Sequence, residues 1–501
     1  MGAKYDELLR QLRDIHNINM AMNLMGWDRQ VNMPRGGAEA RAAQIGTLAK
    51  IAHERFTSDE MGKLLDEAAA EVEGMPYDSD EASMVRVVKE DYAEQTRLPT
   101  EFVEETARVV GVAHEYWADA RQNNDFQHFL PILRQIIDLK RRECELIGYQ
   151  GHPYDALLGQ YERGITSAQV KAIFDEHKPH LVRLISDIQQ VSDRVSDAPV
   201  HGHFPIDQQR EFAVWVIKSY GYDLNRGRYD IAVHPFCNHN SKNDVRVTTR
   251  YYEDFLNPAL FGMMHEAGHA MYEQGIGDNL EGTPLGGGTS LGVHESQSRM
   301  WENIVGRSKG FWSWAYPKLQ ETFPAQFTGV SLDDFYRAVN KVHPSFIRVE
   351  ADEATYNLHI MLRFELEMAM IDGSVGIEKL PQEWNERFES YLGIVPPTDT
   401  LGVLQDVHWS MGLVGYFATY ALGTMLSAQY YRKAVEERPS IPDDIASGRF
   451  DTLLTWMNEN IHIHGRKFTG DELTRRLTGE GIQSKYYTEY LQKKYGELYG
   501  L

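Results

Sequence analysis

Cysteine is scarce in this chain of 501 residues, which has only Cys144 and Cys237. The two lie far apart and form no CxxC pair, so we expect neither a disulfide framework nor a zinc site built on thiolates. So few cysteines fit a reducing cytoplasm.

An excess of positive charge is also missing, because 51 basic and 73 acidic side chains give a formal net charge of −22. Such a surface repels phosphate backbones and anionic membranes, so we expect no nucleic-acid partner and no membrane partner.

A long run of strongly apolar residues is absent as well. One uncharged stretch, Trp409 to Tyr431, is long enough to cross a bilayer. It contains many small and polar residues, and the spacing of Gly415, Thr419, Gly423 and Ser427 predicts a ridge that lets a neighbouring helix approach closely. We therefore expect a buried helix here and no transmembrane span.

The chain also has no Pro/Ser-rich linker, no low-complexity tract and no repeat of fixed period. We expect a single domain over residues 1–501, although a cleft dividing it into two lobes would leave no trace in the sequence. Helical periodicity dominates up to about residue 195, beginning with an amphipathic N-terminus that lacks the layout of a signal peptide. The β-branched segments Tyr229–Val233 and Val245–Thr249 predict a small sheet. The fold class is therefore mainly α.

The residues that follow this sheet predict a helix with unusual chemistry. Asn257 and Pro258 suit a helix start, with Asn257 as the cap, and Gly275 suits its end. Inside it, His265 and His269 stand four residues apart and project from the same face, where two imidazoles can hold one zinc ion.

Glu266, the residue after the first histidine, lies about 100° further round the helix. It can take a proton from metal-bound water without being a ligand itself. A chance HExxH in a chain with 19 histidines is the alternative.

A catalytic site needs a third protein ligand, and the candidate is Glu295. It follows a glycine-rich loop, Gly286 to Gly288, that lacks the Lys-Ser/Thr ending of a phosphate-binding loop and is expected to fold a second helix back beside the first. A solvated glutamate on a surface helix is the alternative for Glu295. His462 and His464 offer another pair, with spacing that would suit a strand. Since no acidic or cysteine partner lies near them in the sequence, we expect ordinary structural histidines.

At this point the sequence resembles the thermostable carboxypeptidase Taq family of zinc metallocarboxypeptidases. The motifs that carry the resemblance span about residues 234 to 409 and occur in order: His234-Pro235-Phe236, Asp244-Val245-Arg246-Val247-Thr248, the HExxH helix, His294-Glu295-Ser296-Gln297, Ile347-Arg348-Val349-Glu350-Ala351 and Gly402-Val403-Leu404-Gln405-Asp406-Val407-His408-Trp409. The resemblance implies a large helical fold with a deep groove, similar to neurolysin and angiotensin-converting enzyme.

It also implies one zinc ion per chain, for which cobalt can substitute, held by His265, His269 and Glu295 with Glu266 as general base. The implied reaction removes single amino acids from the C-termini of peptides with broad specificity, and the implied assembly is a homodimer. Residues of the other motifs, among them His234, Asp244 and Gln405, are then candidate substrate contacts.

A carboxypeptidase must recognise a terminal carboxylate, and a guanidinium matches one with two parallel hydrogen bonds. Arg348 is the first candidate and Arg246 the second, although either arginine could instead serve a structural ion pair with Asp244, Glu350 or Asp352.

The oxyanion that forms during hydrolysis needs a donor from a phenol or an imidazole. His408 and Tyr420 are the candidates, because their separation of twelve residues is similar to the pair in neurolysin-like enzymes. Tyr416 competes with Tyr420, and two tyrosines four residues apart in an uncharged helix are also common in cores.

Two other functions stay open. One is a zinc oligopeptidase or dipeptidyl carboxypeptidase that uses the same metal site but cuts further from the chain end. The other is a helical binding scaffold without catalysis, against which Glu266 argues, because a purely structural zinc site needs no base.

Overall fold

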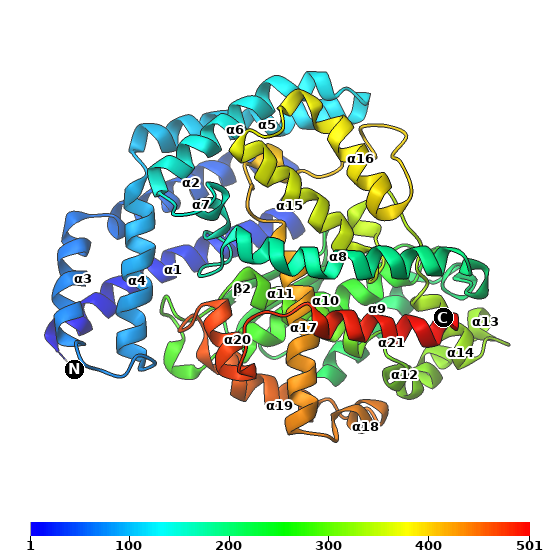
Figure 1. The fold of residues 1–501 in the computed structure, drawn as a ribbon. Helices are drawn as coiled ribbons and strands as arrows, with labels where there is room; N and C mark the ends of the chain where they lie inside the picture. Colours follow the sequence, from blue (N-terminus) through cyan, green and yellow to red (C-terminus); the bar gives the residue numbers. More distant parts are fainter. Residues whose placement is uncertain (1) are drawn as a thin grey trace. The chain divides into compact units, whose positions relative to one another are not determined.

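The structure is a computed structural model that describes residues 2–501 (Figure 1). The chain forms two compact units, each assembled from three separate stretches of sequence. Unit 1 comprises Met1–Thr96, Asp197–Val339 and Tyr430–Gly479, and unit 2 comprises Arg97–Ser196, Asn340–Gln429 and Glu480–Leu501. The mainly α class is confirmed, because helices make up most of both units and only one three-stranded sheet accompanies them among the described residues.

Unit 1 holds the sheet and the helix with the HExxH motif. Its helices and strands are α1 (Ala3–Val31), α2 (Ala38–Phe56), α3 (Asp59–Glu71), α4 (Asp80–Arg97, whose last residue is the first of unit 2), α9 (Ile206–Tyr220), β1 (Gly227–Ile231), β2 (Cys237–Ser241), β3 (Asp244–Thr249), α10 (Asn257–Gln274), α11 (Leu291–Arg299), the π-helix η5 (Met300–Val305), α12 (Lys309–Thr322), α13 (Pro324–Phe327), α14 (Leu332–Val339), α18 (Ile441–Ala446), α19 (Asp451–Asn460) and α20 (Gly470–Thr478).

Unit 2 contains helices and loops, and no strand lies among its described residues. Its elements are α5 (Thr100–Asn123), α6 (Phe126–Ile147), α7 (Tyr154–Leu158), α8 (Ser167–Gln189), the 3₁₀ turn η6 (Arg348–Glu350), α15 (Tyr356–Asp372), α16 (Leu380–Leu392), the 3₁₀ turn η8 (His408–Met411), the first part of α17 (Ala418–Glu437) and α21 (Lys485–Tyr499). Within this unit α5 and α6 pack side by side (Figure 1).

The sheet of unit 1 has the order β1-β3-β2, with β1 parallel and β2 antiparallel to β3. The two strands predicted from β-branched content correspond to β1 and β3. β2 was not predicted, because Cys-Asn-His-Asn-Ser has little β propensity and forms a strand only by pairing with β3. Val245 and Val247 of β3 are fully buried, and this strand packs against α10. The sheet therefore supports the HExxH helix directly.

The sequence predicts one continuous buried helix for the uncharged stretch after His408, and this prediction is wrong. A 3₁₀ turn ends at Met411, and α17 begins only at Ala418. Gly415 lies between them with a φ of 97°, and a Cβ there would come within 2.7 Å of the backbone of Leu157. The chain therefore leaves the helical conformation where a neighbouring backbone approaches. None of the described helices is long and apolar enough to cross a membrane, which agrees with our rejection of a transmembrane span.

Candidate active site

The histidines of the HExxH motif lie in the middle of α10. This helix begins at Asn257 with Pro258 in its first turn, but Asn257 does not cap it: Leu256 occupies the cap position, and the Asn257 side-chain oxygen is buried without a hydrogen-bond partner. The predicted end is confirmed, because Gln274 is the last residue and the N–H of Gly275 donates to the last turn. α10 is a buried helix in contact with β3, α9 and α11, so its side chains are held from several sides.

Three side chains converge beside α10. The Nε2 atoms of His265 and His269 each lie 3.5 Å from Oε2 of Glu295, and one ligand atom from each of these residues lies within 4.8 Å of the others. Glu295 reaches them from α11, which Ser290 caps by accepting a hydrogen bond from the N–H of Val293. The predicted second helix is therefore present, and these residues could hold a metal ion.

Glu295 can come this close because the residue before His269 is a glycine. A Cβ on Gly268 would lie 2.6 Å from Cα of Ser298 and 2.7 Å from the carbonyl oxygen of Gln297. Both atoms belong to the backbone of α11 and have no flexible side chain to move. Gly268 therefore sets the spacing between the helix that carries two predicted ligands and the helix that carries the third.

We expect Gly268→Ala to force the two helices apart. The added methyl group should lower the free energy of unfolding by about 1–3 kcal/mol, as overpacking in a core typically does, and should weaken metal binding because Glu295 moves with α11. Thermal unfolding and metal titration against a chelator measure the two effects.

Gly262→Ala on the same helix is the matched control. Its nearest neighbour would be Oγ1 of Thr249 at 3.4 Å, so this alanine fits. Equal stability and metal affinity in both variants would show that the close approach at Gly268 is unimportant.

The environment of Glu295 favours its ionised form. Burial alone would raise the pKa of this carboxyl, but the guanidinium of Arg299 and the imidazole of His265 outweigh that effect and hold the pKa well below its ordinary value. Nε of Arg299 donates to Oε1 of Glu295 at 2.7 Å. This hydrogen bond occupies one carboxylate oxygen and leaves the other directed at the two histidines.

The first predicted ligand, His265, contacts a carboxylate through the ring nitrogen that faces away from Glu295. Its Nδ1 lies 2.9 Å from Oε2 of Glu302, which belongs to the π-helix η5. Burial opposes the ionisation of Glu302, but Arg299 and the hydrogen bond to His265 lower its pKa to about 2. An ionised Glu302 accepts the Nδ1–H of His265, which leaves the Nε2 lone pair pointing at Glu295. The ring orientation is thus set for metal binding.

The second predicted ligand, His269, is held through another histidine. Its Nδ1 lies 2.6 Å from Nδ1 of His294, and Nε2 of His294 lies 2.7 Å from Oε1 of Glu273. Burial would raise the pKa of Glu273, but the neighbouring His239 and His294 lower it to about 2. With Glu273 ionised, His294 donates to it and accepts from His269. Both predicted histidine ligands therefore have the outer hydrogen bond that metal-binding histidines usually make.

Glu266 stands beside these ligands but does not belong to their cluster. Only 7% of its surface is exposed, and burial raises its pKa to about 7, against the opposing effect of His265. A carboxyl with a pKa near neutrality suits a group that takes up and gives back protons. A cation on the neighbouring ligands would favour the ionised form, which is the form that accepts a proton.

The substrate residues predicted in unit 1 lie on or next to the sheet. Arg246 on β3 donates through Nε and Nη2 to both carboxylate oxygens of Asp244, at 2.7 and 2.8 Å, and lies over the ring of Trp27 at 4.3 Å. The alternative of an ion pair with Asp244 is therefore present in the structure. His234 is exposed in the connection between β1 and β2.

Unit 2 brings Arg348 and Gln405 together around a buried carboxylate. Nε and Nη2 of Arg348 donate to Oδ1 of Asp406 at 3.0 and 2.8 Å, and Nε of Arg363 donates to Oδ2 at 2.6 Å. Gln405 accepts from the backbone N–H of Arg348 at 2.8 Å. The ion pair of Arg348 is thus with Asp406 and not with the predicted alternatives Asp244, Glu350 or Asp352. Two guanidiniums share one carboxylate, so these three side chains carry a net positive charge.

His408 and Tyr420 also meet in unit 2. Nε2 of His408 lies 3.5 Å from the hydroxyl oxygen of Tyr420, and burial lowers the pKa of His408 to about 4, so the imidazole is neutral near pH 7. The guanidinium of Arg348 lies 5.3 Å from the centre of the Tyr420 ring. Tyr416 precedes α17, where its ring makes an edge contact with Tyr161 at 5.2 Å. The ring of Tyr416 also lies beside His408, with ring centres 5.6 Å apart against 6.3 Å for Tyr420, so the 3.5 Å contact of the Tyr420 hydroxyl with Nε2, and not ring proximity, favours Tyr420.

The pair His462 and His464 lies in a 3₁₀ turn, not in the strand that its spacing suggested. His462 is fully buried, with Nδ1 2.7 Å from Asn458 and Nε2 2.8 Å from Gln297. Both ring nitrogens are thus engaged by amide side chains, as befits a structural histidine.

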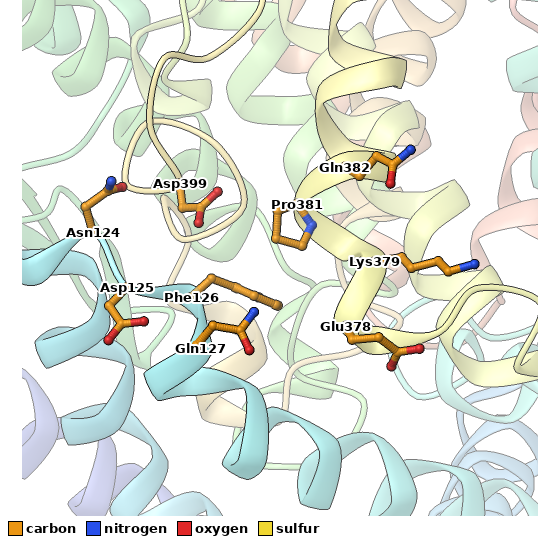
Figure 2. Close-up of a pocket in the computed structure, with 9 residues that line it drawn as sticks. All are labelled: Asn124, Asp125, Phe126, Gln127, Glu378, Lys379, Pro381, Gln382 and Asp399. Carbon is orange, nitrogen blue, oxygen red and sulfur yellow. The ribbon is translucent and has the colours of Figure 1, made fainter.

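A separate cavity of about 460 Å³ lies in unit 2, and none of the predicted site residues lines it (Figure 2). It is formed by the turn before α6, the start of α16 and the segment around Asp399. Asp125 and Asp399 both line it, and the pKa of Asp399 is raised by burial and by the neighbouring Asp125. The chemistry predicted from the sequence does not involve this cavity.

Several partners of the site were missed by reasoning from the sequence. Arg299 and Glu302 follow Glu295 by four and seven residues, a spacing that places all three on one helical face and could have indicated them. Glu273 follows His269 by four residues on α10, so the same spacing could have indicated it. Arg363 gave no such signal, because its contact with Asp406 depends on how distant segments pack.

Two imidazoles and a carboxylate that converge beside a buried glutamate, on a helix supported by a small sheet, are the arrangement of a metal-dependent peptidase. The comparisons with known proteins specify the family. Residues 7–495 match the model of the carboxypeptidase Taq (M32) metallopeptidases, so the chain belongs to this family and is a metallocarboxypeptidase.

Relatives match over nearly the whole chain. Thermostable carboxypeptidase 1 of Thermus thermophilus is 41% identical over 511 residues, with 99% of both chains covered, and carboxypeptidase 1 of Bacillus subtilis is 40% identical over 493 residues, with 98% of both covered. Among solved structures, the M32 carboxypeptidase of Deinococcus radiodurans R1 superimposes with a TM-score of 0.97 at 40% identity and 100% coverage of both chains. Metallocarboxypeptidase 1 of Trypanosoma cruzi gives 0.94 at 36% identity, covering 98% of this chain and 99% of that one. The expected family resemblance is confirmed.

Proposed function

We propose that this metallocarboxypeptidase uses one zinc ion, held by His265, His269 and Glu295, to release single amino acids from the C-termini of peptides with broad specificity. The supporting observation is the donor set: two imidazole nitrogens and one carboxylate oxygen within 4.8 Å, and no thiolate. Three such protein ligands are typical of catalytic zinc, and the same donors suit cobalt. When bound, the metal supplies polarisation of the scissile carbonyl and a more acidic water.

Glu266 is the general base of this proposal. Its carboxylate accepts the proton that the attacking water loses and later donates it to the amine of the departing amino acid. Burial supports the role, because a carboxylate shielded from bulk water keeps a pKa close to neutrality and can act in both directions.

Arg348 binds the terminal carboxylate of the substrate in our proposal. The support is its charge balance: Arg348 and Arg363 share Asp406 alone, which leaves one positive charge in a buried place where an anionic chain end would neutralise it. Arg246 remains the second candidate. Both arginines donate two hydrogen bonds to a carboxylate, but the pair of Arg246 with Asp244 is one-to-one and its charges balance, whereas Arg348 shares Asp406 with Arg363.

The remaining predicted residues have supporting roles. Gln405 fixes the backbone of Arg348 through its side-chain oxygen, and His234 and Asp244 stay proposed substrate contacts near the sheet. His408 and Tyr420 donate hydrogen bonds to the oxyanion, which the 3.5 Å separation of Nε2 and the hydroxyl supports, since both can then point at one oxygen.

A comparison of a peptide with its C-terminally amidated twin tests the reaction. We expect the purified protein to release single amino acids from the free-acid peptide and not from the amide, across a panel of different last residues. Activity should disappear with a chelator and return with zinc. Mass spectrometry identifies the products. Dipeptides would support a dipeptidyl carboxypeptidase, internal fragments an oligopeptidase, and no hydrolysis with zinc bound a binding scaffold.

Arg348→Ala tests, with the same two peptides, whether Arg348 recognises the terminal carboxylate. The variant should lose most of the discrimination between the acid and the amide, because the group that recognises the carboxylate is gone. Arg134→Ala, which removes an exposed arginine paired with Glu378 in the same unit, should keep it. Unchanged discrimination in Arg348→Ala would transfer the role to Arg246.

Three further proposals concern the whole protein. A homodimer is expected from the family and is tested by light scattering. A cytoplasmic location is supported by the two cysteines, which are both free thiols. We also propose that residues 1–501 work as a single catalytic domain.

A further inference from the structure

Glu367 of α15 is a buried carboxylate for which the reaction has no obvious use. Its side chain is fully buried and accepts three hydrogen bonds. Nε1 of Trp409 donates to Oε1 at 2.8 Å, while the hydroxyl of Tyr154 and the backbone N–H of Gly415 donate to Oε2 at 2.7 and 3.0 Å. All three donors are neutral, so the negative charge has no ion-pair partner among them.

Such an arrangement is costly for folding alone. Burial raises the pKa of Glu367 to about 7, although the three donors lower it in part. Arg363 lowers the pKa of Glu367 as well, but it directs its hydrogen bonds to Asp406 and to the carbonyl oxygen of His359. Apolar side chains of similar size usually stabilise a core at least as well as a buried charge. The stability of the core therefore does not explain why a carboxylate is buried here, and the residues that it binds have to be considered.

Two of its three donors lie at opposite ends of one segment. Trp409 follows His408 directly, and Gly415 lies five residues before Tyr420. Between them the chain makes a 3₁₀ turn and a loop, which have no sheet or long helix to fix their course. One carboxylate thus ties together Trp409 and Gly415, two points of the segment that separates His408 from Tyr420.

Gly415 adds a second constraint at the same place. Its φ of 97° favours glycine, and its Cα passes so close to Leu157 that no side chain would fit. The N–H of Gly415 then points at Glu367, at 3.0 Å. The backbone conformation and the carboxylate together fix where the chain enters α17, which carries Tyr420 as its third residue.

We propose that Glu367 is a positioning residue for hydrolysis: by binding Trp409 and Gly415 with its two oxygens it fixes the distance between His408 and Tyr420. This inference rests on the proposed function, in which these two side chains donate to the oxyanion. A shift of about 1 Å in a positioned group can cost about 10²-fold in rate. Glu367 acts only through the loop and touches neither substrate nor metal in this proposal.

Glu367→Gln tests the proposal with little change in size. The amide has one acceptor oxygen, so its NH₂ group must face either the indole N–H or the other two donors. We expect kcat to fall about 10- to 100-fold, with KM and bound metal within about twofold of the parent. Glu365→Gln is the matched control on the same helix: it removes a carboxylate that pairs with Lys178 and Tyr391, and it should leave kcat unchanged.

The resonance of the Trp409 indole N–H provides a readout that does not depend on activity. In protein labelled with ¹⁵N-tryptophan, Trp409→Phe assigns the signal among nine tryptophans. We expect this signal to move and its proton to exchange faster with solvent in Glu367→Gln, and to stay in place in Glu365→Gln. If Glu367→Gln does not fold, Trp409→Phe takes its place, because it removes one of the two loop donors and should lower kcat in the same way.

Combination with Tyr420→Phe separates positioning from simple stabilisation. If Glu367 acts through Tyr420, the double variant should be little slower than Tyr420→Phe alone. Three outcomes would each overturn the proposal. The losses of kcat in Glu367→Gln and Tyr420→Phe could multiply in the double variant, kcat could stay at the parent value although the Trp409 signal shifts, or Glu365→Gln could lose as much kcat as Glu367→Gln. A parent protein that releases no amino acid would contradict the proposed function instead, and the Trp409 signal would still report whether Glu367 holds the loop.

Discussion

Glu266→Gln should leave the protein folded and able to bind its metal, and lower kcat by about 10²–10⁴-fold. The substitution keeps the size of the side chain, while the amide cannot accept a proton from water. Glu266 is not one of the three convergent ligands, so the metal affinity should stay close to that of the parent. A selective loss of turnover is the signature of a proton acceptor that is not a ligand.

The measurement pairs kcat for a free-acid peptide with metal content by atomic absorption. Glu211→Gln, on an exposed face of α9 in the same unit, controls for the loss of one negative charge and should keep full activity. Turnover near that of the parent would remove Glu266 from the mechanism. Loss of the metal together with turnover would make it a ligand instead.

Tyr420→Phe should reduce kcat by about 10²–10³-fold, the usual effect of losing one donor to an oxyanion. Its hydroxyl lies 3.5 Å from Nε2 of His408, so both groups can reach the same oxygen atom. The effect should fall on kcat more than on KM, because the negative charge on that oxygen develops only in the transition state.

Tyr416→Phe is the matched comparison, since it removes the same hydroxyl four residues earlier. The Tyr416 ring packs against the rings of Tyr161 and His408 and lies before α17. Since Tyr416→Phe keeps the ring that makes these contacts, we expect a small effect on kcat. A large loss in Tyr416→Phe and a small one in Tyr420→Phe would exchange the two roles. Equal small effects would reject both tyrosines.

The sequence was most informative where local geometry decides the outcome. Two histidines four residues apart share a helical face whatever surrounds them, so the pairing of His265 with His269 follows from the spacing alone. Glu295 could be proposed because a glycine-rich loop precedes it and a motif contains it. The structure places its carboxylate 3.5 Å from both histidines, and its role as a zinc ligand stays a prediction.

Predictions failed where a neighbour overrides a local preference. Asn257 was expected to cap α10, but Leu256 takes that position and the Asn257 oxygen is buried. Tyr416 was expected in one helix with Tyr420, but the close approach of Leu157 to Gly415 interrupts the helix first. The approach of Leu157 to Gly415 has no signature in the sequence, since it joins segments that are far apart along the chain.

By itself, the sequence determined the mainly helical class, the HExxH helix and the order of the motifs that identify the family. These depend on the periodicity and spacing of neighbouring residues, which helix geometry converts directly into position. Only the tertiary structure decided that Gly268 lets α11 approach α10, that Asp406 is shared by two arginines, and that Glu367 holds two points of one segment. Such contacts arise from the packing of distant segments, so no local pattern encodes them.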